Sequence, residues 1–310
     1  MIKVDLITGF LGSGKTTFLK LYAKYFMEQG LKIGILENDY GAVNVDMLLL
    51  NELRGENCEL EMVAGGCDAD CHRRRFKTKL ISMAMSGYDR VIIEPSGIFD
   101  VDEFFDALRD EPLDRWYDIG NVITIVDAKL EDNLSEESDF FLASQIANAG
   151  IIMLSKTQLA DASNIATTKN HLSLAAKKAK LNIDIDSLVL EKNWDNLTAE
   201  DMKKISTCGY AYRSYIKKLG TDDGGYKTVY FLEVPMTVAS IKEKINTLMN
   251  DSSFGNIFRI KGFFNENGTW YQVNATQKET EIITMPVGQE VFIVIGEHLN
   301  EPEIKKYITA

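Results

Sequence analysis

Short apolar runs alternate with amphipathic stretches along the first two thirds of the chain. The runs have the length of β-strands, and such alternation is typical of a parallel sheet wrapped by helices. Between the first two runs, Leu19, Tyr22, Ala23 and Phe26 recur at helical spacing, and Gly30 is a natural end for that helix. The expected strands are residues 3–8, 32–36, 59–63, 91–94, 122–127 and 151–154.

The pattern changes beyond about residue 206, where strands crowd together with little helix between them, as in a small α+β domain. The polar stretch at 210–225 indicates a linker or a long turn. The elements expected after it are strands at 226–233, 257–264, 269–273, 281–284 and 291–295 and a helix at 238–249. We therefore expect an α/β domain with a mainly parallel sheet at 1–205, a linker at 206–225 and a smaller C-terminal α+β domain at 226–310.

The charge of the chain disfavours two classes of partner. Its 310 residues include 46 acidic and 34 basic side chains, a formal net charge of −12. A surface of that sign repels phosphate backbones and anionic lipids, so we expect neither nucleic acid nor membrane as a partner. The chain shows no secretory signal pattern, no apolar run of membrane-spanning length and only four cysteines, which favours a cytoplasmic protein.

A phosphate-binding loop follows the first expected strand. Residues 9–16 match the pattern G-x-x-x-x-G-K-[ST], and the expected helix comes directly after them. In such a loop, backbone N–H groups surround phosphate oxygens, Lys15 supplies a positive charge and the Thr16 hydroxyl binds Mg²⁺. The residues expected to bind nucleotide here are Gly9, Gly12, Ser13, Gly14, Lys15, Thr16 and Thr17.

Acidic residues end or follow two of the expected strands. Glu94 closes the fourth, where we expect it to hold Mg²⁺, and Gly97 is expected to offer its backbone N–H to the outer phosphate. Glu37 and Asp39 follow the second strand, at the edge where an open α/β sheet binds its ligand. We expect Lys15 and Glu94 to act in catalysis, with Asp39 or Glu37 orienting the ion or a water molecule.

Five segments occur in an order that is known from one protein family. They are residues 9–17, 37–41, 66–71, 94–97 and 155–158. Together they resemble the signature of the CobW/HypB/UreG-like P-loop GTPases, and residues 258–263 and 292–299 look like the C-terminal domain of CobW proteins. The resemblance implies a P-loop NTPase domain, a nucleotide switch, a link to metal trafficking and, by analogy, a nucleotide-dependent homodimer.

The cysteine segment departs from the family pattern. Where the family has Cys-x-Cys-Cys, this chain has Cys67 and Cys71, with His72 directly after. Thiolates at i and i+4 share one face of a helix and can bind one ion, with His72, Glu37 or a nearby aspartate completing the shell. A thiolate-containing tetrahedral site favours Zn²⁺, while more imidazole and carboxylate admits Co²⁺ or Ni²⁺. The alternative is that both cysteines are small buried residues.

The base-recognition segment departs as well. Ser155, Lys156 and Gln158 occupy a motif that reads Asn-Lys-x-Asp in GTPases. An aspartate accepts two hydrogen bonds from guanine, whereas a neutral glutamine offers a single carbonyl acceptor. We therefore expect weaker guanine selectivity, with GTP as the first choice and ATP as the second.

These features together predict a Mg²⁺-dependent switch that binds and slowly hydrolyses GTP. Its expected role is metal trafficking or metallocofactor insertion, with a client metalloprotein as partner. The alternative is a nucleotide-gated accessory protein that docks on a metalloenzyme or a corrinoid protein without carrying metal itself, with ATP or relaxed base specificity.

Overall fold

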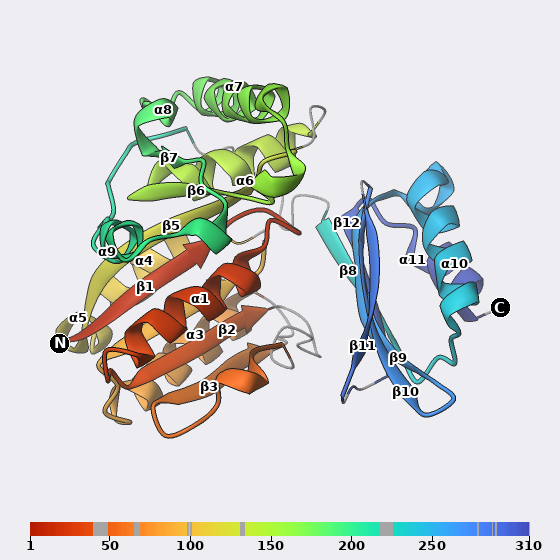
Figure 1. Ribbon diagram of the computed structural model, residues 1–310, viewed down its shortest axis with the longest axis horizontal. Helices are drawn as coiled ribbons and strands as arrows, with labels where there is room; N and C mark the ends of the chain where they lie inside the picture. The colour runs from red at the N-terminus through yellow and green to blue at the C-terminus, as the bar shows by residue number, and fades with distance from the viewer. Residues whose placement is uncertain are drawn as a thin grey trace. The chain divides into compact units, whose positions relative to one another are not determined.

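A parallel sheet organises the first part of the chain (Figure 1). Its seven strands lie in the order β3-β2-β4-β1-β5-β6-β7, and all neighbouring pairs are parallel. The strands are β1 (Ile2–Thr8), β2 (Ile33–Asp39), β3 (Cys58–Ala64), β4 (Arg90–Pro95), β5 (Tyr117–Asp127), β6 (Ile151–Ser155) and β7 (Val189–Leu190). The fold class expected from the alternating pattern is confirmed.

The structure is a computed structural model, and it describes residues 1–39, 49–64, 69–97, 99, 101–130, 134–216, 226–277, 279–286, 288 and 290–309. The chain divides into two compact units, Met1–Lys218 and Leu219–Ala310. The first unit contains the parallel sheet, and the second contains an antiparallel sheet with its own helices. Among the described residues, no helix is both long and apolar enough to cross a membrane.

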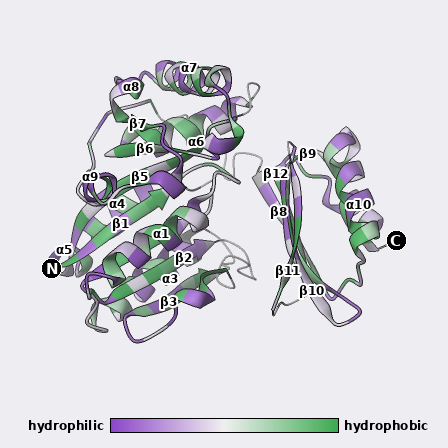
Figure 2. Cartoon of the chain, viewed as in Figure 1, coloured by the Kyte–Doolittle hydropathy of each residue, from purple (hydrophilic) through white to green (hydrophobic). Residues whose placement is uncertain are grey.

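Helices cover both faces of the parallel sheet. They are α1 (Lys15–Met27), α3 (Ala69–Ala84), α4 (Val101–Arg109), α5 (Leu113–Trp116), α6 (Glu136–Ala147), α7 (Ala162–Lys178), α8 (Ile185–Leu188) and α9 (Ala199–Ser206). Val91 and Ile93 of β4 share a core with α3, α4 and α5, whereas Ile92 between them shares a core with α1 and α9. Both faces of the sheet are therefore buried, which explains why the strands are continuous apolar runs. Figure 2 shows the chain coloured by hydropathy.

All six expected strands of the first unit are present, β5 differs most in extent, and β7 is an additional strand. β5 begins at Tyr117 rather than at residue 122, because Tyr117 and Asp118 pair with Ile2 and Lys3 of β1. β7 was not expected, since two residues are too few to form a recognisable apolar run. Polar residues at the start of β5 and the shortness of β7 concealed both features from the hydrophobic pattern.

The second unit is a five-stranded antiparallel sheet in the order β11-β10-β9-β12-β8. Its strands are β8 (Tyr226–Leu232), β9 (Asn256–Glu266), β10 (Thr269–Thr276), β11 (Thr280–Met285) and β12 (Val291–Glu297). The helices α10 (Val238–Asn250) and α11 (Glu301–Thr309) pack on the sheet through residues such as Ile241 and Ile304. The expected elements are confirmed here, and α11 is an addition.

The segment 207–216 belongs to the first unit. Gly209 donates its backbone N–H to Oδ1 of Asn121 at 2.8 Å, and Arg213 donates to the carbonyl oxygens of Ala147 and Ala149 at 3.0 and 3.1 Å. The first unit therefore extends past residue 205, where the linker was expected to begin.

Candidate functional site

Two glycines adopt conformations that shape the loop between β1 and α1. Gly9 has a φ of +148°, and a Cβ there would lie 2.2 Å from the carbonyl oxygen of Ile125. Gly14 has a φ of +94° and forms the N-cap of α1. Since side chains at these positions would be strained, the local geometry itself requires the glycines of the sequence motif.

The start of α1 lacks a side-chain cap within the described residues, unlike α6, α7 and α9, whose caps are Ser135, Asp161 and Thr198. The first backbone N–H groups of a helix have no partner inside the helix, so an uncapped start favours an anion. Ser13, directly before Gly14, is buried, and its Oγ makes no hydrogen bond in the described part of the chain. The loop thus presents donors toward the space that a phosphate group would occupy.

Lys15 lies across the same loop. Its side chain is buried, and its Nζ donates to the carbonyl oxygens of Gly9 at 3.0 Å and Phe10 at 3.4 Å. Gly12, with a φ of +73°, completes the turn, and Thr17 is exposed in the first turn of α1. The ammonium group is therefore held beside the loop backbone, where phosphate oxygens would be its natural partners.

A hydroxyl and two carboxyl groups gather at the carboxyl edge of the sheet. Thr16 Oγ1 donates to Oε1 of Glu94 at 2.8 Å, and Glu94 is the register partner of Glu37 on the neighbouring strand β2. Both glutamates are buried, at 4% and 3% exposure. Two carboxylates buried on adjacent strands repel one another unless positive charge lies nearby, and oxygen donors of this kind suit Mg²⁺. The donor set fits a divalent cation.

Asp39 ends β2 at the same edge, two residues after Glu37. The structure describes its backbone, which pairs with Ala64 of β3, while its side chain lies outside the described part.

Gly97 brings the segment after β4 against the phosphate loop. A Cβ on Gly97 would lie 2.7 Å from the backbone nitrogen of Leu11 and 2.9 Å from its Cα. The carbonyl oxygen of Gly97 accepts a hydrogen bond from Nε2 of Gln145 at 2.9 Å. The sequence pattern did not single out Gln145; its one signal is an amide within the apolar run of α6.

The base-recognition segment lies on the other side of the loop. A Cβ on Gly14 would lie 3.5 Å from Cβ of Ser155 and 3.5 Å from the ring of Trp194. Lys156, which has a left-handed φ of 54°, forms an ion pair with Asp127 at 2.9 Å, and Gln158 is exposed. The structure thus brings Ser155 next to the loop, and it adds Trp194, which sequence reasoning missed.

The expected transition-metal residues are only partly described. Cys67 lies outside the described residues, while Cys71 is half-buried in the first turn of α3. The Nε2 atom of His72 lies 2.7 Å from Oδ1 of Asn38, and both side chains are buried. Within the described ranges, no group of three or more His, Cys, Asp or Glu side chains is arranged to hold a metal ion. His72 therefore joins α3 to β2 through one of its two ring nitrogens.

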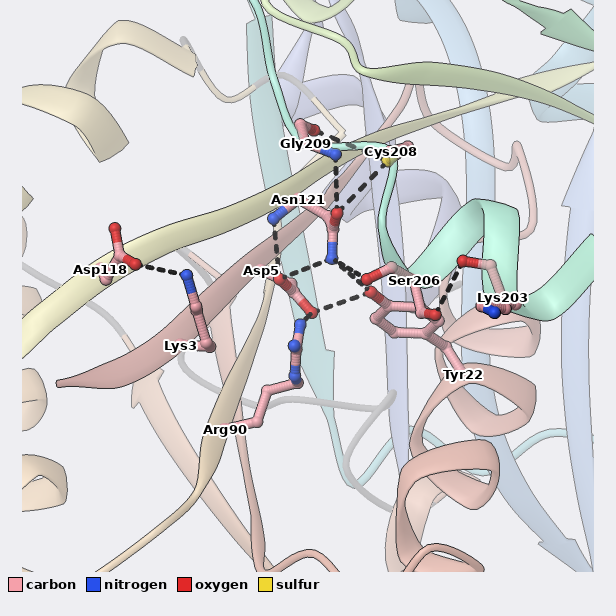
Figure 3. A network of polar contacts seen from close by, with 10 residues as sticks. All are labelled: Lys3, Asp5, Tyr22, Arg90, Asp118, Asn121, Lys203, Ser206, Cys208 and Gly209. Carbon is pink, nitrogen blue, oxygen red and sulfur yellow. Dashed lines mark hydrogen bonds and ion pairs between the residues drawn. The ribbon is translucent and has the colours of Figure 1, made fainter.

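A buried polar network surrounds Asp5 of β1, the strand that leads into the loop (Figure 3). Asp5 of β1 accepts hydrogen bonds from Tyr22 at 2.9 Å and from the backbone of Asn121 at 2.8 Å, and it pairs with Arg90. Burial raises the pKa of Asp5, although the guanidinium of Arg90 opposes that rise. Burial likewise raises the pKa of Tyr22 far above its usual range. The network ties β1, which leads into the loop, to α1, β4 and β5.

Comparison with known proteins places the chain among nucleotide-binding proteins. A model of the CobW/HypB/UreG nucleotide-binding domain matches residues 3–183. Among curated proteins, the zinc chaperone YjiA of Escherichia coli is 31% identical over 170 residues, which are 51% of this chain and 50% of YjiA. The zinc chaperone YeiR of the same species is 30% identical over 158 residues, 51% of this chain and 47% of YeiR.

A longer match extends into the second unit. The zinc-regulated GTPase metalloprotein activator 1 of Schizosaccharomyces pombe is 24% identical over an alignment of 340 residues, covering 98% of this chain and 81% of that protein. The chain spans about half the length of YeiR and YjiA, at 47% and 50%. Because the domain model covers residues 3–183, more than half of the sequence, the chain belongs to the CobW/HypB/UreG family.

Proposed function

We propose that the protein binds a nucleoside triphosphate with Mg²⁺ and hydrolyses it slowly as a conformational switch. The observation that carries the proposal is the hydrogen bond from Thr16 to Glu94 beside the loop that holds Lys15. It joins a phosphate loop to an acidic strand end, which is the arrangement that positions a metal-bound triphosphate in P-loop proteins. Membership of the CobW/HypB/UreG family supports the same activity.

Each residue of the proposed site has a role that follows from its position. The loop residues Gly9, Gly12, Ser13, Gly14, Lys15, Thr16 and Thr17 surround the phosphates. Thr16 and Glu94 would hold Mg²⁺, which when bound supplies charge neutralisation to the phosphate oxygens. Asp39, at the end of β2, is proposed to orient the attacking water. Gly97 is proposed to donate its N–H to the terminal phosphate.

We infer that the base is guanine. Ser155 lies beside the loop, and the ion pair between Lys156 and Asp127 holds the lysine stem where it can cover one face of a base. Gln158, exposed at the end of the motif, would accept one hydrogen bond from guanine. The names of the relatives, which include a zinc-regulated GTPase, support guanine over adenine.

We further propose that the protein carries a transition metal to a client metalloprotein. Relatives of this chain are named as zinc chaperones, which supports zinc as cargo ahead of cobalt or nickel and supports a carrier over an accessory protein without metal. The proposed ligands are Cys67, Cys71 and His72. Glu37, on β2, is proposed as a further ligand. Since His72 contacts Asn38, the residue after Glu37, metal binding and nucleotide binding would influence one another. By analogy with the family, we also propose a nucleotide-dependent homodimer.

The nucleotide proposal is tested by Lys15→Ala with Lys24→Ala as its control. Lys24 lies on the same helix, but its side chain is exposed and pairs with Glu52. We expect Lys15→Ala to weaken triphosphate binding about 100-fold and to abolish phosphate release, because the terminal phosphates lose their cation. Lys24→Ala should behave as the wild type. Undiminished turnover in Lys15→Ala would refute the proposed site.

The metal proposal is tested by equilibrium dialysis with Zn²⁺. We expect a Cys67→Ala/Cys71→Ala variant to lose binding that Cys208→Ala retains, since Cys208 lies on a different segment and bonds to Asn121. Equal zinc binding by both variants would exclude the cysteine pair as ligands.

A further inference from the structure

Gln145 is a buried amide that reaches from α6 to the segment after β4. Its side chain is fully buried, and Nε2 donates to the carbonyl oxygen of Gly97 at 2.9 Å. Its backbone carbonyl accepts from the hydroxyl of Thr124 on β5 at 2.6 Å. The neighbouring residues Leu142 and Ile146 belong to a hydrophobic core, so the amide is held on a rigid element.

The peptide group that precedes Gly97 is also anchored. Its carbonyl oxygen, that of Ser96, accepts the backbone N–H of Phe99 at 3.1 Å, and the N–H of Ser96 donates to the carbonyl oxygen of Asn38 at 2.9 Å. The N–H of Gly97 itself makes no hydrogen bond within the described part of the chain. Gly97 therefore lies between two anchored peptide groups, and its Cα lies against the phosphate loop, since a Cβ there would lie 2.7 Å from the nitrogen of Leu11.

A glycine needs such anchors if its N–H is to point in one direction. Glycine has more backbone freedom than any other residue, so an unanchored Gly97 would sample many orientations. The bond from Gln145 restricts rotation at Gly97, and the close approach of Leu11 limits its movement toward the phosphate loop. The orphaned amide oxygen is informative too, because Oε1 of Gln145 is buried without a hydrogen-bond partner in the described residues. The side chain therefore makes the bond from Nε2 to Gly97 although its buried Oε1 has no partner among the described residues, which costs free energy.

We propose that Gln145 is a positioning residue that makes the site distinguish a nucleoside triphosphate from a diphosphate. It acts by holding the carbonyl of Gly97 so that the N–H of Gly97 faces the terminal phosphate. This inference rests on the proposed function, because it assumes that a triphosphate occupies the loop. It adds a residue from α6, an element with no expected place in the site.

The test compares binding of GDP with binding of a non-hydrolysable GTP analogue in the presence of Mg²⁺, using the full chain. Gln145→Met keeps the size of the side chain and removes its hydrogen bonds. We expect the analogue to bind about tenfold more weakly, while GDP affinity stays within about twofold, because one hydrogen bond near the terminal phosphate is affected. Gln277→Met is the matched control, since Gln277 also donates its amide to backbone carbonyls, those of Met249 and Ile257 at 3.0 and 2.9 Å, in the second unit.

Gln145→Glu provides a second readout that a merely structural residue would not give. An ionised glutamate cannot donate to Gly97, but a protonated one can, and burial raises the pKa of a carboxyl group. We expect Gln145→Glu to lose discrimination at pH 8 and to regain it as the pH falls toward about 5.5, whereas Gln145→Met stays impaired throughout.

Two outcomes would overturn the inference. If Gln145→Met weakened the binding of GDP and of the GTP analogue equally, the role of Gln145 would be purely structural. If the ratio of the two affinities were unchanged in both Gln145→Met and Gln145→Glu, Gln145 would have no role in it. A wild-type protein that binds neither nucleotide would instead refute the proposed function itself.

Discussion

The ammonium group of Lys15 donates hydrogen bonds to the backbone of the phosphate loop. Its bonds to the carbonyls of Gly9 and Phe10 keep a buried charge from being isolated. Single residues of this kind were recognised from the motif alone. Gln145, Asn121 and Trp194 were not, since their importance comes from neighbours distant in sequence.

Asp139 shows the same limit of single-residue reasoning. The acidic run at 130–139 favours a solvated loop or helix start, and Glu136 and Glu137 do lie in the first turn of α6. Asp139 is instead buried, accepting from His171 at 2.8 Å and from Lys178 at 2.5 Å. Pairing with His171 and Lys178 of α7 offsets the free-energy cost of burying the charge of Asp139. The local sequence does not predict this pairing, because the partners are distant along the chain.

The first prediction concerns base specificity. Gln158→Asp introduces the carboxylate that accepts two hydrogen bonds from guanine in other GTPases. We therefore expect the ratio of GTP affinity to ATP affinity to rise about tenfold. Isothermal titration with both nucleotides measures that ratio. Gln158→Glu, which adds the same charge on a longer side chain, is the control. A ratio that does not move in Gln158→Asp would place the base elsewhere.

The second prediction concerns Cys58 of β3. Burial, with a smaller contribution from Glu59, raises the pKa of this thiol to about 11, above the value of about 8.5 expected in the unfolded chain. The unfolded chain therefore loses the proton first, so the stability tied to the neutral thiol is complete below about pH 8.5 and is lost as the pH rises toward 11.

Cys58→Val removes this titration while filling a similar volume. We expect the wild type to lose about 1–2 kcal/mol more than Cys58→Val between pH 8 and 10, measured by urea unfolding. Tyrosines and Cys208 titrate in both proteins, so their effects cancel in the difference. Parallel pH profiles would contradict the prediction.

At the scale of elements, buried side chains hold the segment after α9 to the sheet. Asn121 of β5 donates to the carbonyl of Ser206 at 2.9 Å and accepts from the backbone of Gly209 at 2.8 Å (Figure 3). Further along, the hydroxyl of Tyr215 donates to Asp102 of α4 at 3.2 Å, and its oxygen lies 3.3 Å from Oγ of Ser144 on α6. The last segment of the first unit thus contacts the helix that follows Gly97 and the helix that carries Gln145.

The third prediction follows from Asn121. Asn121→Ala would leave the Ser206 carbonyl and the Gly209 N–H without their partner, so we expect a loss of about 3 kcal/mol and faster hydrogen exchange at 206–212. Asn250→Ala is the control, because Asn250 is exposed and its amide donates to Asn246 within α10. Unchanged exchange in Asn121→Ala would show that other contacts hold the segment.

At the scale of the molecule, each unit has its own hydrophobic core. The clusters around Val91 and Ile92 lie in the first unit, and the cluster around Ile260 lies wholly in the second. Separate cores predict two unfolding transitions in calorimetry. Since the proposed nucleotide site lies in the first unit, a ligand would stabilise that unit directly.

The fourth prediction is that GTP with Mg²⁺ at about 100 times its dissociation constant stabilises the first unit by about 2.7 kcal/mol. We expect one of the two transitions to move upward by several degrees, with slower hydrogen exchange in β1 and α1 and little change in β12 and α11. Lys15→Ala should show no shift. A single transition that moves as a whole would mean that the units unfold together.

The sequence by itself determined the class of the fold, the order of its strands along the chain and the phosphate loop. These features depend on local physics: the period of apolar residues, the backbone freedom of glycine and the charge of one lysine. Only the tertiary structure decided that Glu37 and Glu94 lie on neighbouring strands, that Gly97 touches Leu11, and that Gln145 anchors Gly97. Those contacts join residues far apart in sequence, and burial with hydrogen bonding across the sheet, rather than any local pattern, brings them together.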